Sequence, residues 1–582
     1  MKRRALYAAG SLALLALAWW LPTGWYDSLA RQPDTPPLPF RGVTLLRFTF
    51  LVEALLLGVL ALVDWRPRPL PPAERLDLRK PDDVPDDLTW SNALSLLVVI
   101  TLIAIALRAY HIGSDLWLDE ITPIVDYGHM PFAQVLGTYL RTNNHLLNTL
   151  LIKLSIGAFG ESEWSVRLPA MLFGAATVPL FYWIGRLALS RWASVASALV
   201  LAVSYHHVFF SQNARGYSAY LFFGLLTSGV LIRALADDRG WRWCLYVVAI
   251  VLGFASLANM VFVLAAHVML GAAAVVAVRT RGGSGLPLVR RLALVFGASG
   301  FLSFQLYAAP LPEMYAVISH LYVREATGFA PLSMEFLREV VRGVSAGFGG
   351  VLPTIVLLVL GAAGVSILFR ASWLLTAALG LPPILTAVFL VARGLSFSPR
   401  FFLLLVPLTI LAVMAAAEAP LSALLGRRQS RGVLHPRRAA LLGAVLALAS
   451  LASLPRYYRT PKQSYREALA YLERNHGPGD RVVVIYAAEG GFRYYATRVG
   501  VKAPEDYKYA RTLSGFDSLV GAPNGNVVVV TTFPRVLRAD LPALAERIER
   551  NWKPQRAFAG TIGDGDITVW TRKPHCNTPN CG

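Results

Sequence analysis

The stretch SNALSLLVVITLIAIALRAYHIGSDLWLDE, residues 91–120, decides the fold of this chain. Its first part, 92–109, is continuously apolar and carries a single charge, Arg108, near its end. A hydrocarbon core of about 30 Å needs roughly 20 residues of helix, and every backbone N–H and C=O inside lipid must be bonded within the segment. The stretch therefore predicts a membrane-spanning helix followed closely by two adjacent carboxylates, Asp119 and Glu120.

The rest of the chain has the same apolar character. Of the 582 residues, 55% are hydrophobic and only 15% are charged, whereas soluble domains are about 45–50% apolar and about 25% charged. The apolar blocks are continuous rather than alternating, which excludes the strands of a transmembrane β-barrel. They predict about thirteen spans, at 5–22, 43–64, 92–109, 166–187, 192–210, 217–235, 242–257, 259–278, 292–310, 349–369, 371–392, 400–417 and 439–454.

The net charge of +20 indicates topology rather than nucleic-acid binding. Most Lys and Arg lie in short loops between apolar blocks, and loops rich in these residues stay on the cytoplasmic side of a membrane. This rule places the loops at 66–80, 279–291 and 427–438 inside. The segments expected outside are 109–144, 211–217, 311–348, 396–400 and the C-terminal part.

Two segments need a separate interpretation. The start, MKRR followed by an apolar block, resembles a signal peptide, but no cleavage pattern precedes Pro22 and many spans follow. We interpret it as an uncleaved signal anchor. The segment 145–160 is apolar but short, with Lys153 in its middle. If it crossed the membrane, every later basic loop would lie outside, so we expect a half-buried or interfacial helix, or a span with other limits.

From about residue 459 the composition becomes that of a soluble domain. SYREALAYLERNHGPGD, 464–480, predicts an amphipathic helix ended by a Gly-Pro-Gly turn. Val-rich strands are predicted at 481–486, 526–532 and 567–571, and a helix at 541–552, which together indicate a small α/β domain. The expected domains are 1–91 (two extra N-terminal transmembrane helices and a cytoplasmic loop), 92–458 (transmembrane) and 459–582 (extracytoplasmic α/β).

The outward loop after the quoted span carries the first candidate site residues. Asp119 and Glu120 lie at the membrane face, with Trp117 two residues before Asp119. An acid where lipid meets water is costly unless it has partners, so it is a functional candidate by default. A carboxylate within hydrogen-bond reach can take a proton from a hydroxyl nucleophile. The alternative for Asp119 is a structural one, a loop carboxylate that caps the next helix.

Three more outward segments hold candidates: His145 in RTNNHLLN (141–148), Asn213, Arg215 and Tyr217 in SQNARGYSAY (211–220), and Arg400 in SFSPRFF (396–402). A guanidinium pairs well with phosphate oxygens, so Arg215 and Arg400 predict a phosphate site. The alternative is that both arginines snorkel to the interface, and a lone His is usually structural. No Walker loop, GxGxxG after a strand, HExxH or nucleophile elbow occurs, which leaves nucleotide chemistry and ATP-driven transport without support.

In order and spacing these motifs resemble those of the GT-C superfamily of membrane glycosyltransferases. The most similar branch holds the protein O-mannosyltransferases, the lipid A aminoarabinose transferases and bacterial lipopolysaccharide sugar transferases. The resemblance runs from about 92 to 475; each motif alone is loose, but their order is specific. It comprises the Trp-x-Asp-Glu loop at 117–120, His-Leu-Leu at 145–147, GESEWSVRLPAMLFG at 160–174, SQNARGYSAY at 211–220, the Arg-Phe pair at 400–401 and the helical stretch from 464.

The resemblance implies transfer of a sugar from a polyprenyl-phosphate carrier to an acceptor hydroxyl, usually with inversion. Asp119 would be the general base, and Glu120 would orient it or help hold a divalent metal ion, the one candidate cofactor. Arg215 and Arg400 would hold the carrier phosphate and stabilise its charge as it leaves. The residues implied to shape the substrate pocket are Trp117, His145, Asn213 and Tyr217.

Two features depart from the family pattern. Many relatives have an acid where Asn213 stands, so a second acidic contact to the acceptor or metal is missing here. The two spans before residue 92 are also extra, since the Asp-Glu loop of many relatives follows their first span.

The sequence thus predicts an α-helical integral membrane protein of the GT-C type with a small C-terminal extracytoplasmic α/β domain. Its expected location is the cell membrane, and its expected partners are a polyprenyl-phosphate-linked donor, membrane lipid and a glycan, lipid or protein acceptor. The alternative is a transporter or flippase of lipid-linked saccharides, which would place ionisable residues and broken helices at mid-membrane. Apart from Arg47, Glu53 and Lys153, the spans are mostly free of charge, which favours the enzyme.

Overall fold

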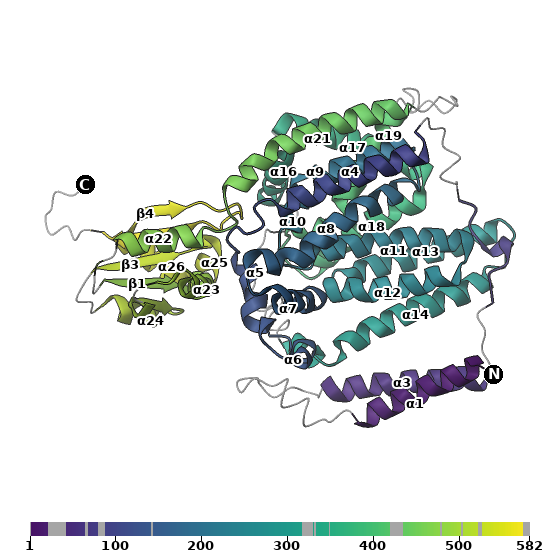
Figure 1. Cartoon of the computed structure of the whole chain (residues 1–582), viewed down its shortest axis with the longest axis horizontal. Helices are drawn as coiled ribbons and strands as arrows, with labels where there is room; N and C mark the ends of the chain where they lie inside the picture. The colour runs from purple at the N-terminus through teal and green to yellow at the C-terminus, as the bar shows by residue number, and fades with distance from the viewer. Residues whose placement is uncertain are drawn as a thin grey trace.

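The chain folds into a large helical bundle with a small α/β domain at one end (Figure 1). The computed structural model describes residues 2–20, 42–63, 68–78, 88–140, 144–316, 330, 333–348, 350–419, 435–475, 477, 480–501, 504–521 and 526–573. Every predicted span coincides with a helix or with a pair of consecutive helices within these ranges. The helices are α1 (Lys2–Trp20), α3 (Gly42–Leu62), α4 (Trp90–Ala109), α8 (Glu163–Gly185), α9 (Arg191–Val203), α10 (Tyr205–Ser211), α11 (Tyr217–Asp237), α12 (Gly240–Ser256), α13 (Met260–Thr280), α14 (Leu286–Ala308), α17 (Val351–Ala371), α18 (Trp373–Ala392), α19 (Leu405–Glu418) and α21 (Pro436–Arg459).

The helical, multi-pass membrane fold is confirmed, but the count of thirteen spans is not. In the described part of the chain, nine helices are long and apolar enough to cross a membrane. A tenth span results if α9 and α10, which meet at an angle of 58°, are taken together. The helices α12 and α19 are apolar but shorter, with 17 and 14 residues.

The segment with Lys153 in its middle forms the short helix α7 (Leu146–Phe159). Its 14 residues rise about 21 Å at 1.5 Å per residue, which is less than a hydrocarbon core of about 30 Å. The Lys153 ammonium donates to the backbone oxygen of Gly128 at 3.4 Å and lies 5.1 Å from the centre of the Phe132 ring. The charge is therefore accommodated beside the segment 124–132, which follows α5 (Leu118–Pro123), and the depth of α7 in a membrane stays a prediction.

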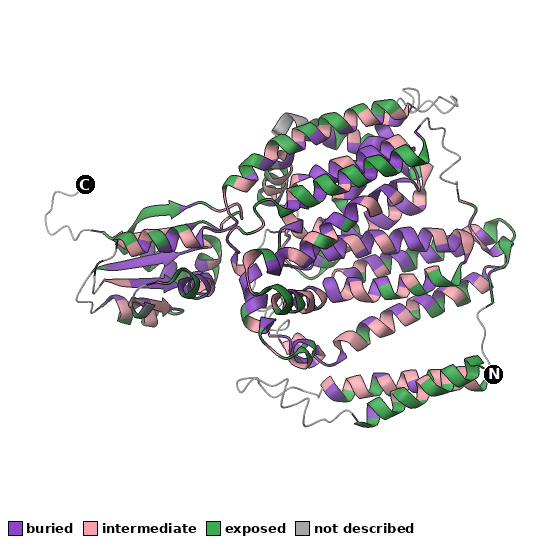
Figure 2. Ribbon diagram, viewed as in Figure 1, coloured by how far each residue is buried: buried purple, intermediate pink, exposed green. Residues whose placement is uncertain are grey.

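The two extra N-terminal helices, α1 and α3, pack on each other at one side of the bundle, where α3 contacts α14 (Figure 1). The side-chain amide of Gln305 donates to the Glu53 carboxylate at 2.9 Å, so one mid-helix charge of α3 has a partner. At Gly42 the backbones approach so closely that a Cβ would lie 1.8 Å from the carbonyl oxygen of Ala309. Figure 2 shows that little of this pair is buried in the isolated chain, as expected of helices that face lipid.

The C-terminal domain is a five-stranded mixed sheet with helices on both faces. The strand order is β2-β1-β3-β5-β4; β2, β1 and β3 run parallel, and β5 is antiparallel to β3 and β4. The small α/β domain predicted from the sequence is confirmed. Its strands are β1 (Arg481–Ile485), β2 (Tyr507–Ala510), β3 (Val527–Thr531), β4 (Trp552–Phe558) and β5 (Ile567–Arg572), and its helices α22 (Tyr465–Asn475), α23 (Glu489–Val499), α24 (Leu513–Val520), α25 (Pro534–Asp540) and α26 (Pro542–Asn551).

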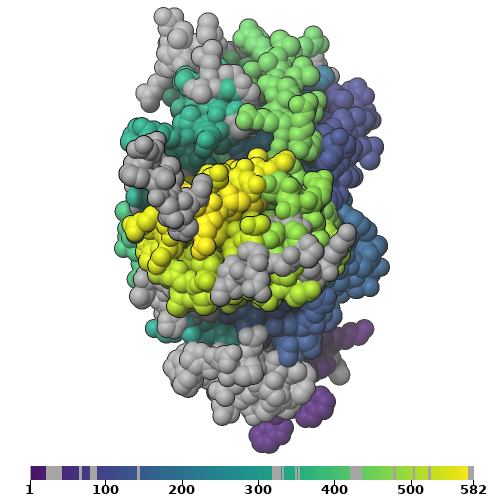
Figure 3. Space-filling view, turned by 90° about the vertical axis from the view of Figure 1, so that its left-hand side faces the viewer, coloured from purple at the N-terminus to yellow at the C-terminus, as the bar shows by residue number. Residues whose placement is uncertain are grey.

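One hydrophobic core joins this domain to the bundle. On one face of the sheet, buried side chains of α22 and α23 form a cluster with Leu116, Ile121 and Val166 of the helical part. The opposite face is covered by α24 and α26. Figure 3 looks along the long axis and shows the domain, in green and yellow, in front of the end of the bundle. Burial of apolar surface therefore fixes the domain against the loop that carries Asp119.

In their described parts, the segments expected outside lie at this same end of the bundle (Figure 1). They form short elements rather than spans, and the membrane side that they face stays a prediction. These elements are α5 (Leu118–Pro123), a π-helical turn (Ile124–Gly128), α6 (Phe132–Gly137), α16 (Met334–Phe348) and a 3-10 turn (Pro399–Phe402).

Candidate active site

Asp119 stands in the first turn of α5 and meets two arginines from distant parts of the chain. Its Oδ2 lies 2.5 Å from Arg215 Nη1, in the turn between α10 and α11, and 3.5 Å from Arg400 Nη1, in the 3-10 turn before α19. The Asp119 side chain is 22% exposed and that of Arg400 37%, whereas Arg215 is 4% exposed. The structure thus brings together three predicted residues that are 96 and 281 positions apart.

The predicted pocket residues surround Arg215. Its guanidinium carbon lies 5.8 Å from the centre of the Trp117 ring and 5.1 Å from that of Tyr217. The Trp117 indole N–H points at Asn213 Oδ1 at 3.5 Å, and both side chains are buried. Cation–π contacts with two rings hold the guanidinium in place and leave it beside Asp119.

His145 lies beside Tyr217, with the two ring centres 5.7 Å apart. Its Nδ1 is 3.2 Å from the carbonyl oxygen of Ser256. Burial lowers the pKa of His145 well below its usual value, and the charges of Arg215 and Arg400 act in the same sense, so the ring is neutral. Because a carbonyl can only accept, Nδ1 carries the proton and Nε2 is a hydrogen-bond acceptor. This buried Nε2 has no hydrogen-bond partner among the described residues.

A glycine allows this approach of α11 to α12. A Cβ at Gly216 would lie 1.9 Å from the carbonyl oxygen of Ser256 and 3.1 Å from His145 Cβ. The residue after Arg215 therefore has to be glycine for the turn to sit against the end of α12 and the start of α7.

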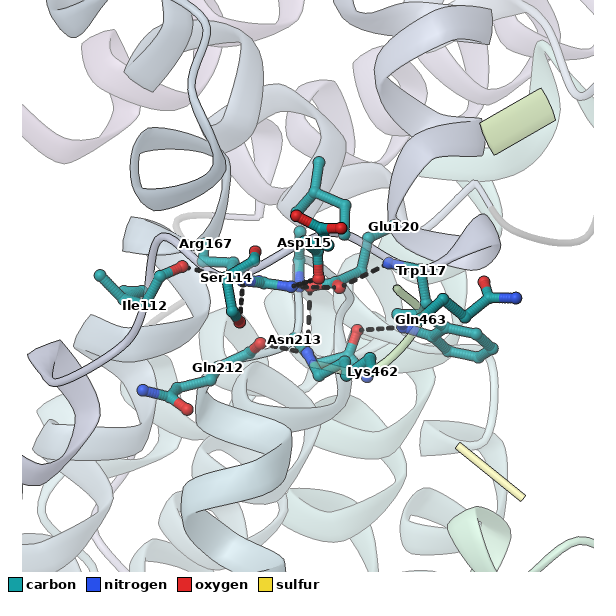
Figure 4. Close-up of polar contacts among 12 residues, drawn as sticks. Ile112, Ser114, Asp115, Trp117, Glu120, Arg167, Gln212, Asn213, Lys462 and Gln463 are labelled. Atoms are coloured by element: carbon teal, nitrogen blue, oxygen red, sulfur yellow. Dashed lines mark hydrogen bonds and ion pairs between the residues drawn. The ribbon is translucent and has the colours of Figure 1, made fainter. Parts of the chain in front are cut away.

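Glu120, the neighbour of Asp119, is fully buried in a network of donors (Figure 4). Arg167 Nε and Nη2 donate to its two oxygens at 2.8 and 2.7 Å, and the backbone N–H groups of Ala214 and Trp117 donate at 2.8 and 3.3 Å. Lys462 Nζ adds a contact at 3.2 Å. Burial alone would raise the pKa of Glu120, but the charges of Arg167 and Lys462 outweigh it and lower the pKa to about 2. Glu120 is therefore ionised, and each oxygen accepts more than one hydrogen bond.

Arg167, in the first half of α8, was not among the predicted site residues. Besides Glu120, it donates to the backbone oxygens of Ile112, Ser114 and Asp115 at 2.8, 2.6 and 3.0 Å. One guanidinium thus fixes the course of the loop between α4 and α5. A signal was present in GESEWSVRLPAMLFG, because Arg167 is a charge inside an otherwise apolar span.

Lys462 was also missed, because it follows the last predicted span without any motif around it. Its side chain is 2% exposed, and Nζ donates to the backbone oxygen of Gln212 as well as to Glu120. Burial lowers the pKa of Lys462 to about 7, with Arg167 acting in the same sense and Glu120 opposing.

This pKa gives the stability of the protein a defined pH dependence. In the unfolded chain the pKa of a Lys side chain is about 10.4. Between about pH 7 and about pH 10 the unfolded chain therefore binds more protons at Lys462 than the folded protein does. The contribution of Lys462 to the free energy of unfolding therefore rises with pH over this window. We expect the difference in free energy of unfolding between wild type and Lys462→Met to increase from about pH 7 to about pH 10, measured by chemical unfolding in detergent. A difference that stayed constant or fell would contradict this assignment.

The residues around Glu120 do not fit a divalent metal ion. Both Glu120 oxygens accept from cationic or backbone donors, and Asp119 Oδ2 is paired with Arg215. A hard divalent ion needs several oxygen ligands at once. No group of three or more His, Cys, Asp or Glu side chains in the described ranges is arranged to hold a metal.

The chain is similar to several known proteins. Three solved structures align with the chain: ArnT from Cupriavidus metallidurans in the apo state (12% identity, 82% of this chain and 98% of that one, TM-score 0.48), the Archaeoglobus fulgidus oligosaccharyltransferase tethered to an acceptor peptide (15%, 81% and 74%, 0.43) and arabinosyltransferase EmbB from Mycobacterium smegmatis (16%, 71% and 42%, 0.38). With identities of 12–16% and TM-scores below 0.5, all three likenesses are distant. No curated protein sequence matches the chain.

A family model gives the sequence-level match. The model of the dolichyl-phosphate-mannose-protein mannosyltransferases matches residues 146–301, about a quarter of the chain. The matched part includes Arg167 and Arg215, the partners of Glu120 and Asp119. Over these residues the match confirms the resemblance to membrane glycosyltransferases of the GT-C type that the sequence motifs indicated.

Proposed function

We propose that this chain transfers a monosaccharide from a polyprenyl-phosphate carrier to an acceptor hydroxyl, on the extracytoplasmic face and with inversion. The observation that carries the proposal is the convergence of Asp119, Arg215 and Arg400 at the end of the bundle. Two guanidinium groups converge on one carboxylate there, and a guanidinium fork pairs well with phosphate oxygens.

In the proposed reaction the acceptor oxygen attacks the anomeric carbon of the sugar from the side opposite the carrier phosphate. Asp119 takes the hydroxyl proton, the new carbon–oxygen bond forms, and the bond to the phosphate oxygen breaks with its electron pair left on that oxygen. Arg215 and Arg400 stabilise the charge that grows on the phosphate. Because an alkyl phosphate is a good leaving group, no general acid is needed.

His145 supports the same assignment. Its unpartnered Nε2 is an acceptor, so it suits a hydroxyl group of a substrate rather than a phosphate oxygen. It lies beside Tyr217, which stacks under Arg215. A sugar hydroxyl held by His145 would place the sugar next to the phosphate held by the arginines, as the proposed donor requires.

The alternative function, transport of lipid-linked saccharides, is suggested by the broken span formed by α9 and α10. In a transporter, such a break typically lines a substrate path. Here Arg108 fills it: its Nη1 donates to the carbonyl oxygen of Ala202 at 2.8 Å, and the side chain is fully buried. Since the protein itself satisfies this freed carbonyl, the break favours the enzyme.

The carrier-phosphate role of Arg400 gives a binding test. We expect Arg400→Ala to weaken binding of polyprenyl phosphate by about 10- to 150-fold, because a hydrogen bond to a charged group is worth about 1.5–3 kcal/mol. The measurement is the Kd of polyprenyl phosphate for purified protein in detergent. Arg370→Ala, at an exposed position at the end of α17, is the matched control and should leave the Kd unchanged. An unchanged Kd in Arg400→Ala would remove Arg400 from the phosphate site.

A further inference from the structure

The residues that connect α21 to the C-terminal domain, 461–466, are here called the connecting segment. Connections between domains normally run over the surface, yet Lys462, Gln463 and Ser464 are only 2%, 0% and 2% exposed. The segment lies between the loop that carries Asp119 and the C-terminal domain, and it bonds to both.

On the side of the Asp119 loop, the segment holds the residues before and after Asp119. Gln463 Oε1 accepts from the backbone N–H of Leu118 at 2.8 Å, and Lys462 Nζ donates to Glu120 at 3.2 Å. Earlier in the loop, Asp115 accepts from the backbone N–H and the guanidinium of Arg466 at 2.8 and 3.0 Å. Asp119 is therefore flanked on both sides by residues that the connecting segment fixes.

On the other side, the same segment bonds to the C-terminal domain. Gln463 Nε2 donates to Thr532 Oγ1 at 3.0 Å and to the carbonyl oxygen of Gly565 at 3.2 Å. Ser464 Oγ donates to the carbonyl oxygen of Ala559 at 2.7 Å. Because Leu118 N–H can only donate and Gly565 C=O can only accept, the orientation of the Gln463 amide is fixed. One side chain thus links the Asp119 loop to the end of strand β3 and the β4–β5 loop.

We propose that Lys462 and Gln463 are positioning residues for Asp119, which makes the C-terminal domain an integral part of the active site. The inference rests on the proposed function of Asp119. Catalytic efficiency falls steeply when a reacting group is displaced, by about 10²-fold for 1 Å. Lys462 also contacts the turn that carries Arg215, through the backbone oxygen of Gln212. Gln463, in contrast, has no hydrogen bond to Arg215 or Arg400 within the described residues, so we expect phosphate binding to be independent of the Gln463 link.

The test is Gln463→Glu in the full-length protein, with Gln555→Glu on the exposed strand β4 as the matched control. The carboxylate introduced by Gln463→Glu would keep an acceptor for Leu118 N–H but lose both donors to the C-terminal domain. We expect kcat for transfer to fall about 10²-fold, while KM for the donor and the Kd of polyprenyl phosphate stay within about twofold. The control should match wild type in all three.

Hydrogen exchange supplies a readout that is independent of activity. In Gln463→Glu, amide exchange of the segment 114–122 should accelerate, while the strands of the C-terminal sheet exchange as in wild type. Lys462→Arg, which keeps the charge beside Glu120, should retain more of kcat than Lys462→Met. A lower kcat with unchanged carrier binding, faster exchange of 114–122 and the higher kcat of Lys462→Arg together support the positioning role.

The opposing outcomes separate this inference from the proposed function. An active wild type with unchanged kcat in Gln463→Glu would overturn the positioning role and leave the proposed function standing. Equal loss of kcat and carrier binding would also overturn it, because the segment would then be a general structural support. A wild type that releases no polyprenyl phosphate from any donor would overturn the proposed function and this inference together.

Discussion

Replacing Asp119 by Asn is expected to lower kcat for sugar transfer by about 10²–10⁴-fold, the contribution of a well-placed general base. The amide keeps the size of the side chain but cannot take the proton of the acceptor hydroxyl. Because the carrier phosphate is assigned to Arg215 and Arg400, the Kd of polyprenyl phosphate should not weaken. Removal of a negative charge that pairs with both arginines should instead tighten it.

Asp517→Asn, at a half-exposed carboxylate on α24, is the matched control for this substitution. Its kcat and its thermal unfolding midpoint should equal those of wild type. If Asp119→Asn transferred sugar at the wild-type rate, Asp119 would not be the base. If it lost activity only because it unfolded earlier than Asp517→Asn, its role would be structural.

The second large effect is expected at Arg167. Arg167→Met would leave the fully buried Glu120 without its strongest donors, and breaking a buried ion pair on one side costs about 3–5 kcal/mol. It would also leave three backbone oxygens of the loop before Asp119 without this donor. We expect a free energy of unfolding lower by about 3 kcal/mol or more, measured by chemical unfolding in detergent.

The double variant Arg167→Met, Glu120→Gln provides the control, since the remaining amide carries no buried charge. It should be more stable than Arg167→Met alone, and measuring Glu120→Gln as well completes the cycle that gives the coupling energy between the two side chains. Wild-type stability in Arg167→Met would show that Lys462 and the backbone donors suffice to hold Glu120, and would contradict this account of the network.

The adjacent carboxylates illustrate how far sequence reasoning reaches. The sequence predicted Asp119 and Glu120 as a pair, in which Glu120 would orient Asp119 or help hold a metal ion. Neighbouring residues on a helix do not share a face, so Asp119 points to Arg215 and Arg400 while Glu120 points into the buried network around Arg167. The orienting role agrees with that geometry, whereas the two oxygens of Glu120 are already occupied by donors.

The remaining differences have physical causes of the same kind. Arg215 and Arg400 could be selected because arginines at outer span ends are sparse, but Lys462 and Gln463 act through contacts between segments 342 and 345 positions apart. No local pattern encodes such contacts. Strand β4, WKPQRAF, was missed because its middle residues are exposed at the sheet edge and do not alternate. Cys576 and Cys581 are close enough in sequence to allow a small disulfide, but this tail lies outside the described residues.

The most direct test of the central claim is release of free polyprenyl phosphate by purified wild-type protein from a panel of polyprenyl-phosphate monosaccharides, with and without EDTA. The account predicts release from at least one donor that disappears in Asp119→Asn and persists in EDTA, since the Glu120 network does not fit a divalent ion. Binding of these lipids without release from any donor, in the presence of candidate acceptors, would contradict the glycosyltransferase assignment and favour the transporter.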